Sequence, residues 1–277
     1  MAKPNVIITG VPRSGTTLAC YLLNKLPDVI ALHEPIRVRA VLRLGSRDAM
    51  CEAVDHFFRK ARKSLRASGA TISRQSGGKV VDNSFADQTS ASGGREMTDK
   101  RGEFVADKEL SERFLLCTKD PALFTILLAD LAPRFPCFAI VRNPVSILTS
   151  WNSVNFPMHD ILEPAVGTFA PKLAAALADT KDELDWQIKA LSWYFETYVE
   201  LLPSHAILRY EDLISSNGQA LRVVTPAAET LREPLENKNK NVLYDRKLMQ
   251  AFGERLLQSE GVIWQFYEKA EVEALLQ

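Results

Sequence analysis

Short apolar runs separated by longer amphipathic stretches dominate the chain. Five of these runs are short and rich in β-branched or other apolar residues, which is typical of buried strands. They cover Asn5–Thr9, Val29–Leu32, Phe114–Thr118, Cys137–Val141 and Ala206–Arg209. Between residues 182 and 202, apolar side chains recur at a helical period and predict a long helix. Strands that alternate with helices predict an α/β fold, in which a parallel sheet is flanked by helices.

The segment from about residue 69 to residue 102 breaks this pattern. Glycine, serine, threonine and charged residues dominate it, most clearly at 76–78 and 90–94. A stretch of this length without periodicity, inside a compact domain, is either a functional loop or disordered. We therefore expect a single domain over residues 1–277, with a mobile loop at about 69–102 that covers a site or binds an acceptor.

Composition narrows the classes of partner. The 277 residues include 34 basic and 34 acidic side chains, so no general attraction to nucleic acid or to an anionic membrane is expected. No apolar run approaches the roughly 20 residues that span a bilayer, and no signal-peptide pattern precedes the first strand. The four cysteines and four histidines lack disulfide or metal-ligand spacing. We expect a cytoplasmic protein that needs no metal, and its oligomeric state stays open.

A glycine-bounded loop follows the first strand and leads into an apolar-periodic helix. It runs from Gly10 to Thr17 with the sequence G-V-P-R-S-G-T-T. Such a loop turns backbone N–H groups and the positive end of a helix toward one point, where a phosphate or sulfate binds. The ATP-binding loop G-x-x-x-x-G-K-[ST] has the same glycine spacing, but Thr16 replaces its lysine and Arg13 supplies the cation. This loop therefore suits a phosphate ligand better than triphosphate hydrolysis.

The loop resembles the 5′-phosphosulfate-binding loop of sulfotransferases that use 3′-phosphoadenosine-5′-phosphosulfate (PAPS). The resemblance implies that five loop residues bind this donor: Arg13, Ser14, Gly15, Thr16 and Thr17. A second matching segment places Arg142 at the end of a strand and Ser150 eight residues later. In the family an arginine and a serine at these places bind the 3′-phosphate. A third segment, Tyr-Glu-Asp, implies that Tyr210 lies close to the nucleotide.

Two further segments resemble the tyrosylprotein branch of the family. Lys119, in a Lys-Asp-Pro sequence, matches a lysine near the transferred sulfonate, and Glu34 matches the general-base glutamate. The resemblance implies in-line transfer of the sulfonate from PAPS, leaving adenosine 3′,5′-bisphosphate (PAP). Lys119 and Arg13 would stabilise the sulfonate and the departing oxygen. His33 is the rival base, since histidine titrates near neutral pH, but strand alternation predicts that only one of these neighbours faces the site.

The acceptor is less defined than the donor. The resemblance favours a hydroxyl or amine of a small natural product, for example a saxitoxin-type alkaloid, as in soluble bacterial tailoring enzymes. Residues 155–160 are a candidate acceptor contact, and residues 236–241 either close over the phosphates or form a surface turn. Two other classes stay open: a P-loop kinase or NTPase, which the missing lysine disfavours, and a non-catalytic nucleotide-binding protein, which Glu34 and Lys119 disfavour.

Overall fold

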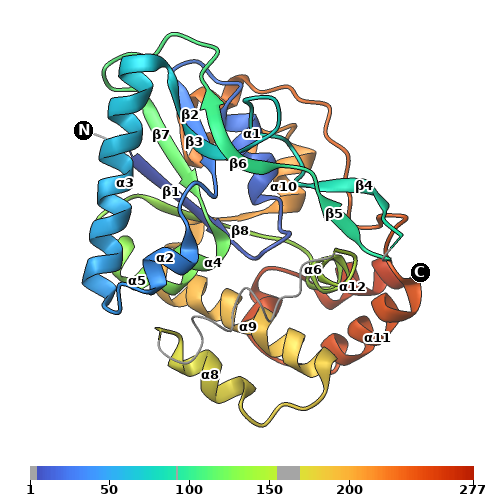
Figure 1. The fold of residues 1–277 in the computed structure, drawn as a ribbon. Helices are drawn as coiled ribbons and strands as arrows, with labels where there is room; N and C mark the ends of the chain where they lie inside the picture. Colours follow the sequence, from blue (N-terminus) through green and yellow to red (C-terminus); the bar gives the residue numbers. More distant parts are fainter. Residues whose placement is uncertain (1–4, 92, 155–168) are drawn as a thin grey trace.

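A five-stranded parallel sheet forms the centre of the protein in a computed structural model that describes residues 5–91, 93–154 and 169–277 (Figure 1). The strands are β1 Asn5–Gly10, β2 Val29–His33, β7 Leu115–Lys119, β8 Cys137–Val141 and β9 Ile207–Arg209. Their order across the sheet is β2-β7-β1-β8-β9, and every neighbouring pair is parallel. Each strand begins and ends within one residue of a predicted run, so the predicted parallel α/β sheet is confirmed.

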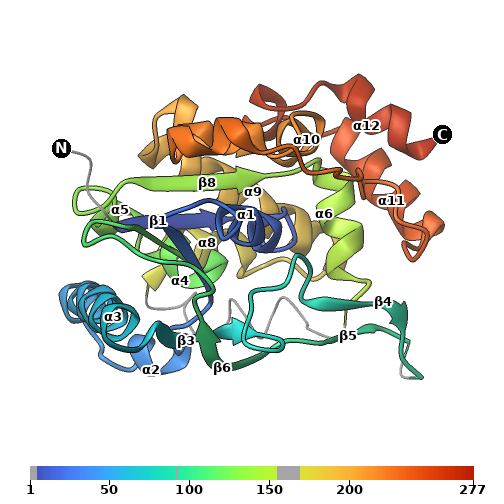
Figure 2. The ribbon, with the colours of Figure 1, turned by 90° about the horizontal axis from the view of Figure 1, so that it is seen from above.

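Helices cover both faces of this sheet. They are α1 Thr16–Leu23, α2 Val38–Leu42, α3 Arg47–Ser68, α4 Pro121–Ile126, α5 Leu128–Leu131, α6 Pro144–Trp151, α8 Pro171–Leu177, α9 Glu183–Leu201, α10 Tyr210–Ser215, α11 Arg246–Leu257 and α12 Lys269–Leu276. Figures 1 and 2 show α1 on one face, with α8 and α9 on the other. The predicted long helix is α9, which Asp182 caps by accepting a hydrogen bond from the Asp185 N–H. Across the described ranges, none of the helices is both long and apolar enough to cross a bilayer.

The central strands carry continuous apolar runs because both faces of the sheet are covered. Every residue of β2 and of β8 is buried. A half-exposed strand would instead alternate apolar and polar residues. All four cysteines are buried and free, as expected of small apolar side chains in a core.

The segment at about 69–102 contains regular structure, contrary to the prediction. Its strands are β3 Ala70–Gln75, β4 Phe85–Thr89, β5 Arg95–Met97 and β6 Lys100–Val105. They pair antiparallel, β3 with β6 and β4 with β5. Figure 2 shows both pairs along one side of the sheet, with α10, α11 and α12 on the opposite side. A mobile role for the segment stays a prediction.

Polar residues on the buried face of β3 explain why the sequence pattern predicts a loop here. Thr71, Ser73 and Gln75 are buried, whereas Ile72 between them is 46% exposed. The alternation of a strand is present, but the buried positions are polar and an exposed one is apolar. A pattern based on hydrophobicity therefore misses it.

Candidate active site

The carboxyl ends of the five central strands open on one cavity. Parallel strands present these ends at the same edge of a sheet, which is where open α/β sheets bind their ligands. The cavity has a volume of about 550 Å³, within the range of small-molecule sites. The sequence-predicted residues that line it are Arg13, Gly15, Thr16, Thr17, His33, Glu34, Lys119, Arg142 and Tyr210. Ser14 and Ser150 lie behind this lining, and both are fully buried.

Ser14 holds the loop to the sheet and does not face the cavity. Its hydroxyl donates to the Ile140 carbonyl of β8 over 2.7 Å, and its backbone N–H donates to the Val11 carbonyl over 3.0 Å. Both donors of Ser14 thus have partners within the protein, and its predicted part in binding the donor nucleotide stays a prediction. Gly10 allows the close approach to β8: its φ is +151°, and a Cβ there would lie 2.4 Å from the Ile140 oxygen.

Three guanidinium groups gather at one end of the cavity, which we call the anion end: Arg13, Arg95 and Arg142. Arg13 Nε donates to Ser150 Oγ over 3.1 Å, and its guanidinium lies 4.5 Å from the centre of the Phe85 ring. Burial, together with the charges of Arg95 and Arg142, lowers the pKa of Arg13 to about 10. A bound anion would relieve this crowding of positive charge. The Arg13 side chain thus lies with Ser150, and its predicted contact with the sulfonate stays a prediction.

Arg142 is held in place but keeps one free donor. Its Nε donates to Asn239 Oδ1 over 2.7 Å, and its Nη1 donates to the Arg13 carbonyl over 3.2 Å. Its guanidinium also lies 4.5 Å from the centre of the Tyr210 ring. The Nη2 atom is buried, and no residue in the described part of the chain accepts a hydrogen bond from it. A phosphate oxygen would satisfy this charged donor well.

The Tyr210 ring contacts both Arg142 and the loop after β1. A Cβ at Gly15 would lie only 2.7 Å from the Tyr210 ring, and Gly15 has a φ of +95°. The Tyr210 hydroxyl accepts the Lys238 N–H over 3.1 Å. Burial raises the pKa of Tyr210, so this hydroxyl stays neutral. Tyr210 therefore connects the loop, Arg142 and the segment at 236–241.

The segment at 236–241 lies against the anion end rather than forming an isolated surface turn. Asn239 is buried, and besides accepting from Arg142 it donates from Nδ2 to Glu211 Oε1 over 2.8 Å. Tyr244, which follows the segment, also lines the cavity. Burial would raise the pKa of Tyr244, but the neighbouring Arg142, Ser150 and Arg13 outweigh burial and lower it. The sequence did not predict that Tyr244 lines the cavity. Its position just after the polar segment at 236–241 was the only indication.

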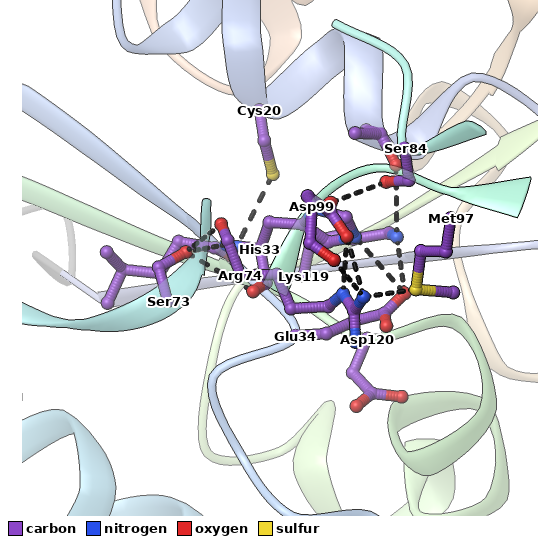
Figure 3. A network of polar contacts seen from close by, with 12 residues as sticks. Cys20, His33, Glu34, Ser73, Arg74, Ser84, Met97, Asp99, Lys119 and Asp120 are labelled. Carbon is purple, nitrogen blue, oxygen red and sulfur yellow. Dashed lines mark hydrogen bonds and ion pairs between the residues drawn. The ribbon is translucent and has the colours of Figure 1, made fainter. Parts of the chain in front are cut away.

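The other end of the cavity, which we call the base end, contains Lys119 and Glu34 (Figure 3). Lys119 Nζ lies 2.7 Å from Glu34 Oε1 and 3.3 Å from Thr17 Oγ1. Burial opposes the negative charge of Glu34, but Lys119 and His33 together hold the pKa of Glu34 well below its ordinary value. Glu34 is therefore an ionised carboxylate, which can accept a hydrogen bond from a molecule in the cavity.

Both His33 and Glu34 reach the base end, although strand alternation predicted only one. β2 ends at His33, and Glu34 has a left-handed φ of +41°, so the alternation stops there. The Glu34 N–H still donates to the Lys119 carbonyl over 2.8 Å. The side chain of Glu34 is 30% exposed and that of His33 is 1% exposed. Both residues line the cavity, and Glu34 is the more exposed of the two.

The predicted acceptor contact at 155–160 lies outside the described residues. For metal binding, the described ranges hold no group of three or more His, Cys, Asp or Glu side chains that could coordinate an ion.

Comparison with known proteins identifies the family. A family model described as the sulfotransferase family matches residues 4–230. The chain belongs to the sulfotransferase family. The match includes both ends of the cavity up to Tyr210. A search of curated proteins finds no match to this chain.

Two solved structures are similar to this chain at low identity. One is the sulfotransferase from Alicyclobacillus acidocaldarius, at 14% identity and a TM-score of 0.39, covering 100% of this chain and 95% of that chain. The other is sulfotransferase STF1 from Mycobacterium tuberculosis H37Rv, at 12% identity and a TM-score of 0.32, covering 100% of this chain and 77% of that chain.

Proposed function

We propose that this protein transfers the sulfonate group of PAPS to a hydroxyl or amine of a small-molecule acceptor and releases PAP. The observation that carries the proposal is the division of one cavity into an anion end and a base end. The anion end has crowded guanidinium groups and the unpartnered Nη2 of Arg142. The base end has a buried lysine beside a partly exposed carboxylate.

The residues present fit the charges of PAPS. The unpartnered donor of Arg142, next to Ser150 and Arg13, suits the 3′-phosphate. The backbone N–H groups where α1 begins, at Thr16 and Thr17, suit the phosphosulfate. Lys119 reaches the same helix end through Thr17, so its charge lies where the sulfonate would be held.

Glu34 and Lys119 supply the chemistry of the transfer. The acceptor oxygen or nitrogen forms a bond to sulfur while the bond from sulfur to the bridging phosphate oxygen breaks. Glu34 takes the acceptor's proton, and PAP departs with the bonding electrons on that oxygen. Lys119 stabilises the charge that shifts from the sulfonate to the departing oxygen. Both groups are already placed before the reaction, so catalysis rests on positioning and electrostatics.

The proposal is tested by binding and by a single-turnover reaction. Calorimetry with PAP should detect binding, and adenosine 5′-monophosphate, which lacks the 3′-phosphate, should bind more weakly. Sulfur-labelled PAPS, incubated with a panel of phenols, alcohols and amines, should then yield an acceptor that gains the mass of one SO₃ group. Binding of PAP without transfer to any acceptor would indicate a non-catalytic nucleotide-binding protein. Absence of PAP binding would refute the proposal.

A further inference from the structure

A buried network connects Glu34 to the antiparallel segment at 70–105 (Figure 3). His33 Nε2 lies 3.3 Å from Glu34 Oε1, and His33 Nδ1 lies 3.2 Å from Asp99 Oδ2. Asp99 immediately precedes β6, and its side chain has no exposed surface. The imidazole of His33 therefore lies between two carboxylates, one in the cavity and one in the interior.

Asp99 is held firmly on its other sides. Arg74 Nη2 lies 2.7 Å from Asp99 Oδ1 and also donates to the Asp99 carbonyl over 2.8 Å. The Ser84 hydroxyl donates to Asp99 Oδ2 over 2.8 Å. Burial opposes the charge of Asp99, but contacts with His33, Arg74 and Ser84 outweigh burial and lower the pKa of Asp99. Asp99 is therefore a fixed negative charge behind the imidazole.

We propose that His33 and Asp99 are positioning residues that hold the Glu34 carboxylate for proton transfer. This inference rests on the proposed function. Both ion pairs of Glu34, with Lys119 and with His33, fall on Oε1, which leaves Oε2 as the oxygen for the acceptor's proton. No residue in the described part of the chain accepts a hydrogen bond from His33 Nδ1, so its contact with Asp99 is a close approach rather than a directed hydrogen bond. Asp99 holds the ring from the interior side, and the ring in turn holds Glu34.

Other groups around His33 come from three elements. Lys119 of β7 and Arg74 of β3 are cations that pair with the two carboxylates. Asp120, just before α4, has its pKa raised to about 7 by burial and by the charge of Glu34. Cys20 of α1 stays a neutral thiol, because burial raises its pKa to about 12. Glu34 and Asp99 are the two carboxylates within ion-pair distance of the ring.

The test compares Asp99→Asn with Asp107→Asn, which replaces an exposed carboxylate that lies just after the same segment and pairs with Lys79. We expect Asp99→Asn to lower kcat by about tenfold to a hundredfold, because a misplaced catalytic group costs rate. The KM for the acceptor and the Kd for PAP should stay within about threefold of the wild-type values. The double variant Asp99→Asn/His33→Gln should be only slightly less active than Asp99→Asn alone, because the two residues act as one unit. Asp107→Asn should behave as the wild type in all these assays.

One further readout separates positioning from a merely structural role. Nitrogen NMR, without donor or acceptor, should show a change in the ring signals of His33 between the wild type and Asp99→Asn, because the carboxylate that faces Nδ1 is lost. Asp107→Asn should leave these signals unchanged. Unchanged NMR signals, or additive losses in the double variant, would overturn this inference. Absence of transfer by the wild type would refute the proposed function instead, and the NMR comparison would still decide the role of Asp99.

Discussion

Replacement of Arg142 by alanine should weaken binding of PAP far more than binding of adenosine 5′-monophosphate. The guanidinium is buried, stacked on Tyr210 and held by Asn239, so its Nη2 cannot turn to another partner without breaking these contacts. We have assigned this atom to the 3′-phosphate. The two nucleotides differ only in that phosphate, so their comparison isolates the contact.

The expected loss follows from the burial of the contact. Truncation of one partner of a buried, charged hydrogen-bonded pair costs about 2–5 kcal/mol. A loss of about 3 kcal/mol corresponds to a rise of more than about a hundredfold in the Kd for PAP. The Kd for adenosine 5′-monophosphate should change by less than about fivefold, because the remaining positive groups still attract its phosphate. Isothermal titration calorimetry measures both constants on the same preparation.

The same measurement contains its control and its refutation. Lys172, an exposed lysine paired with Glu200 far from the cavity lining, provides the control, and Lys172→Ala should leave both constants within about twofold. Equal weakening of both nucleotides by Arg142→Ala would show that Arg142 does not contact the 3′-phosphate. The proposal that the anion end binds the 3′-phosphate would then be wrong.

Three further predictions concern the base end, the loop and pH. Glu34→Gln should lower single-turnover transfer by about 10²–10⁴-fold while the Kd for PAP stays within about threefold, and near-normal transfer would exclude Glu34 as the base. Gly15→Ala should lower the free energy of unfolding by roughly 1–3 kcal/mol in urea, because of its φ of +95° and the Tyr210 ring, whereas Gly77→Ala, with nothing within 4 Å, should cost less. Burial, aided by Glu34, raises the pKa of Asp120 to about 7 from 3.8, so the native state binds a proton that the unfolded chain releases, and stability falls as pH rises through this window. In urea unfolding, the free energy of unfolding of Asp120→Asn relative to that of the wild type should therefore rise by roughly 2–3 kcal/mol between about pH 5 and about pH 8. A difference between the two proteins that stays constant over this pH range would contradict the raised pKa of Asp120.

The sequence predicted the central sheet well because burial on both faces leaves a simple signal. The strand β8 is apolar along its whole length and β2 is apolar as far as Leu32, and charged residues follow both strands. The antiparallel segment gave a weaker signal, since the buried side chains of its first strand, β3, are polar. Ser73, for example, accepts the His33 N–H through Oγ over 2.9 Å. Such contacts become visible only after distant parts of the chain have been brought together.

The candidate site shows the same division. Local motifs pointed to Arg142, Tyr210, Lys119 and Glu34, and all of them line one cavity. The partner of the Ser14 hydroxyl could not be predicted, because it is a carbonyl of a strand that lies more than a hundred residues away in the sequence. The contact between His33 and Asp99 and the position of Tyr244 in the cavity likewise join distant parts of the chain, so no local motif indicates them.

Glu34 has a left-handed backbone, a conformation that glycine adopts more readily than any other residue. Such strain costs roughly 1–3 kcal/mol and must be compensated by the surrounding structure. Selection for thermal stability alone would therefore favour substitutions of Glu34, such as glycine, that remove the backbone strain and with it the carboxylate. If Glu34 has the proposed role, a more heat-stable variant would have to be selected for transfer activity as well, since stability and activity would place opposite demands on this residue.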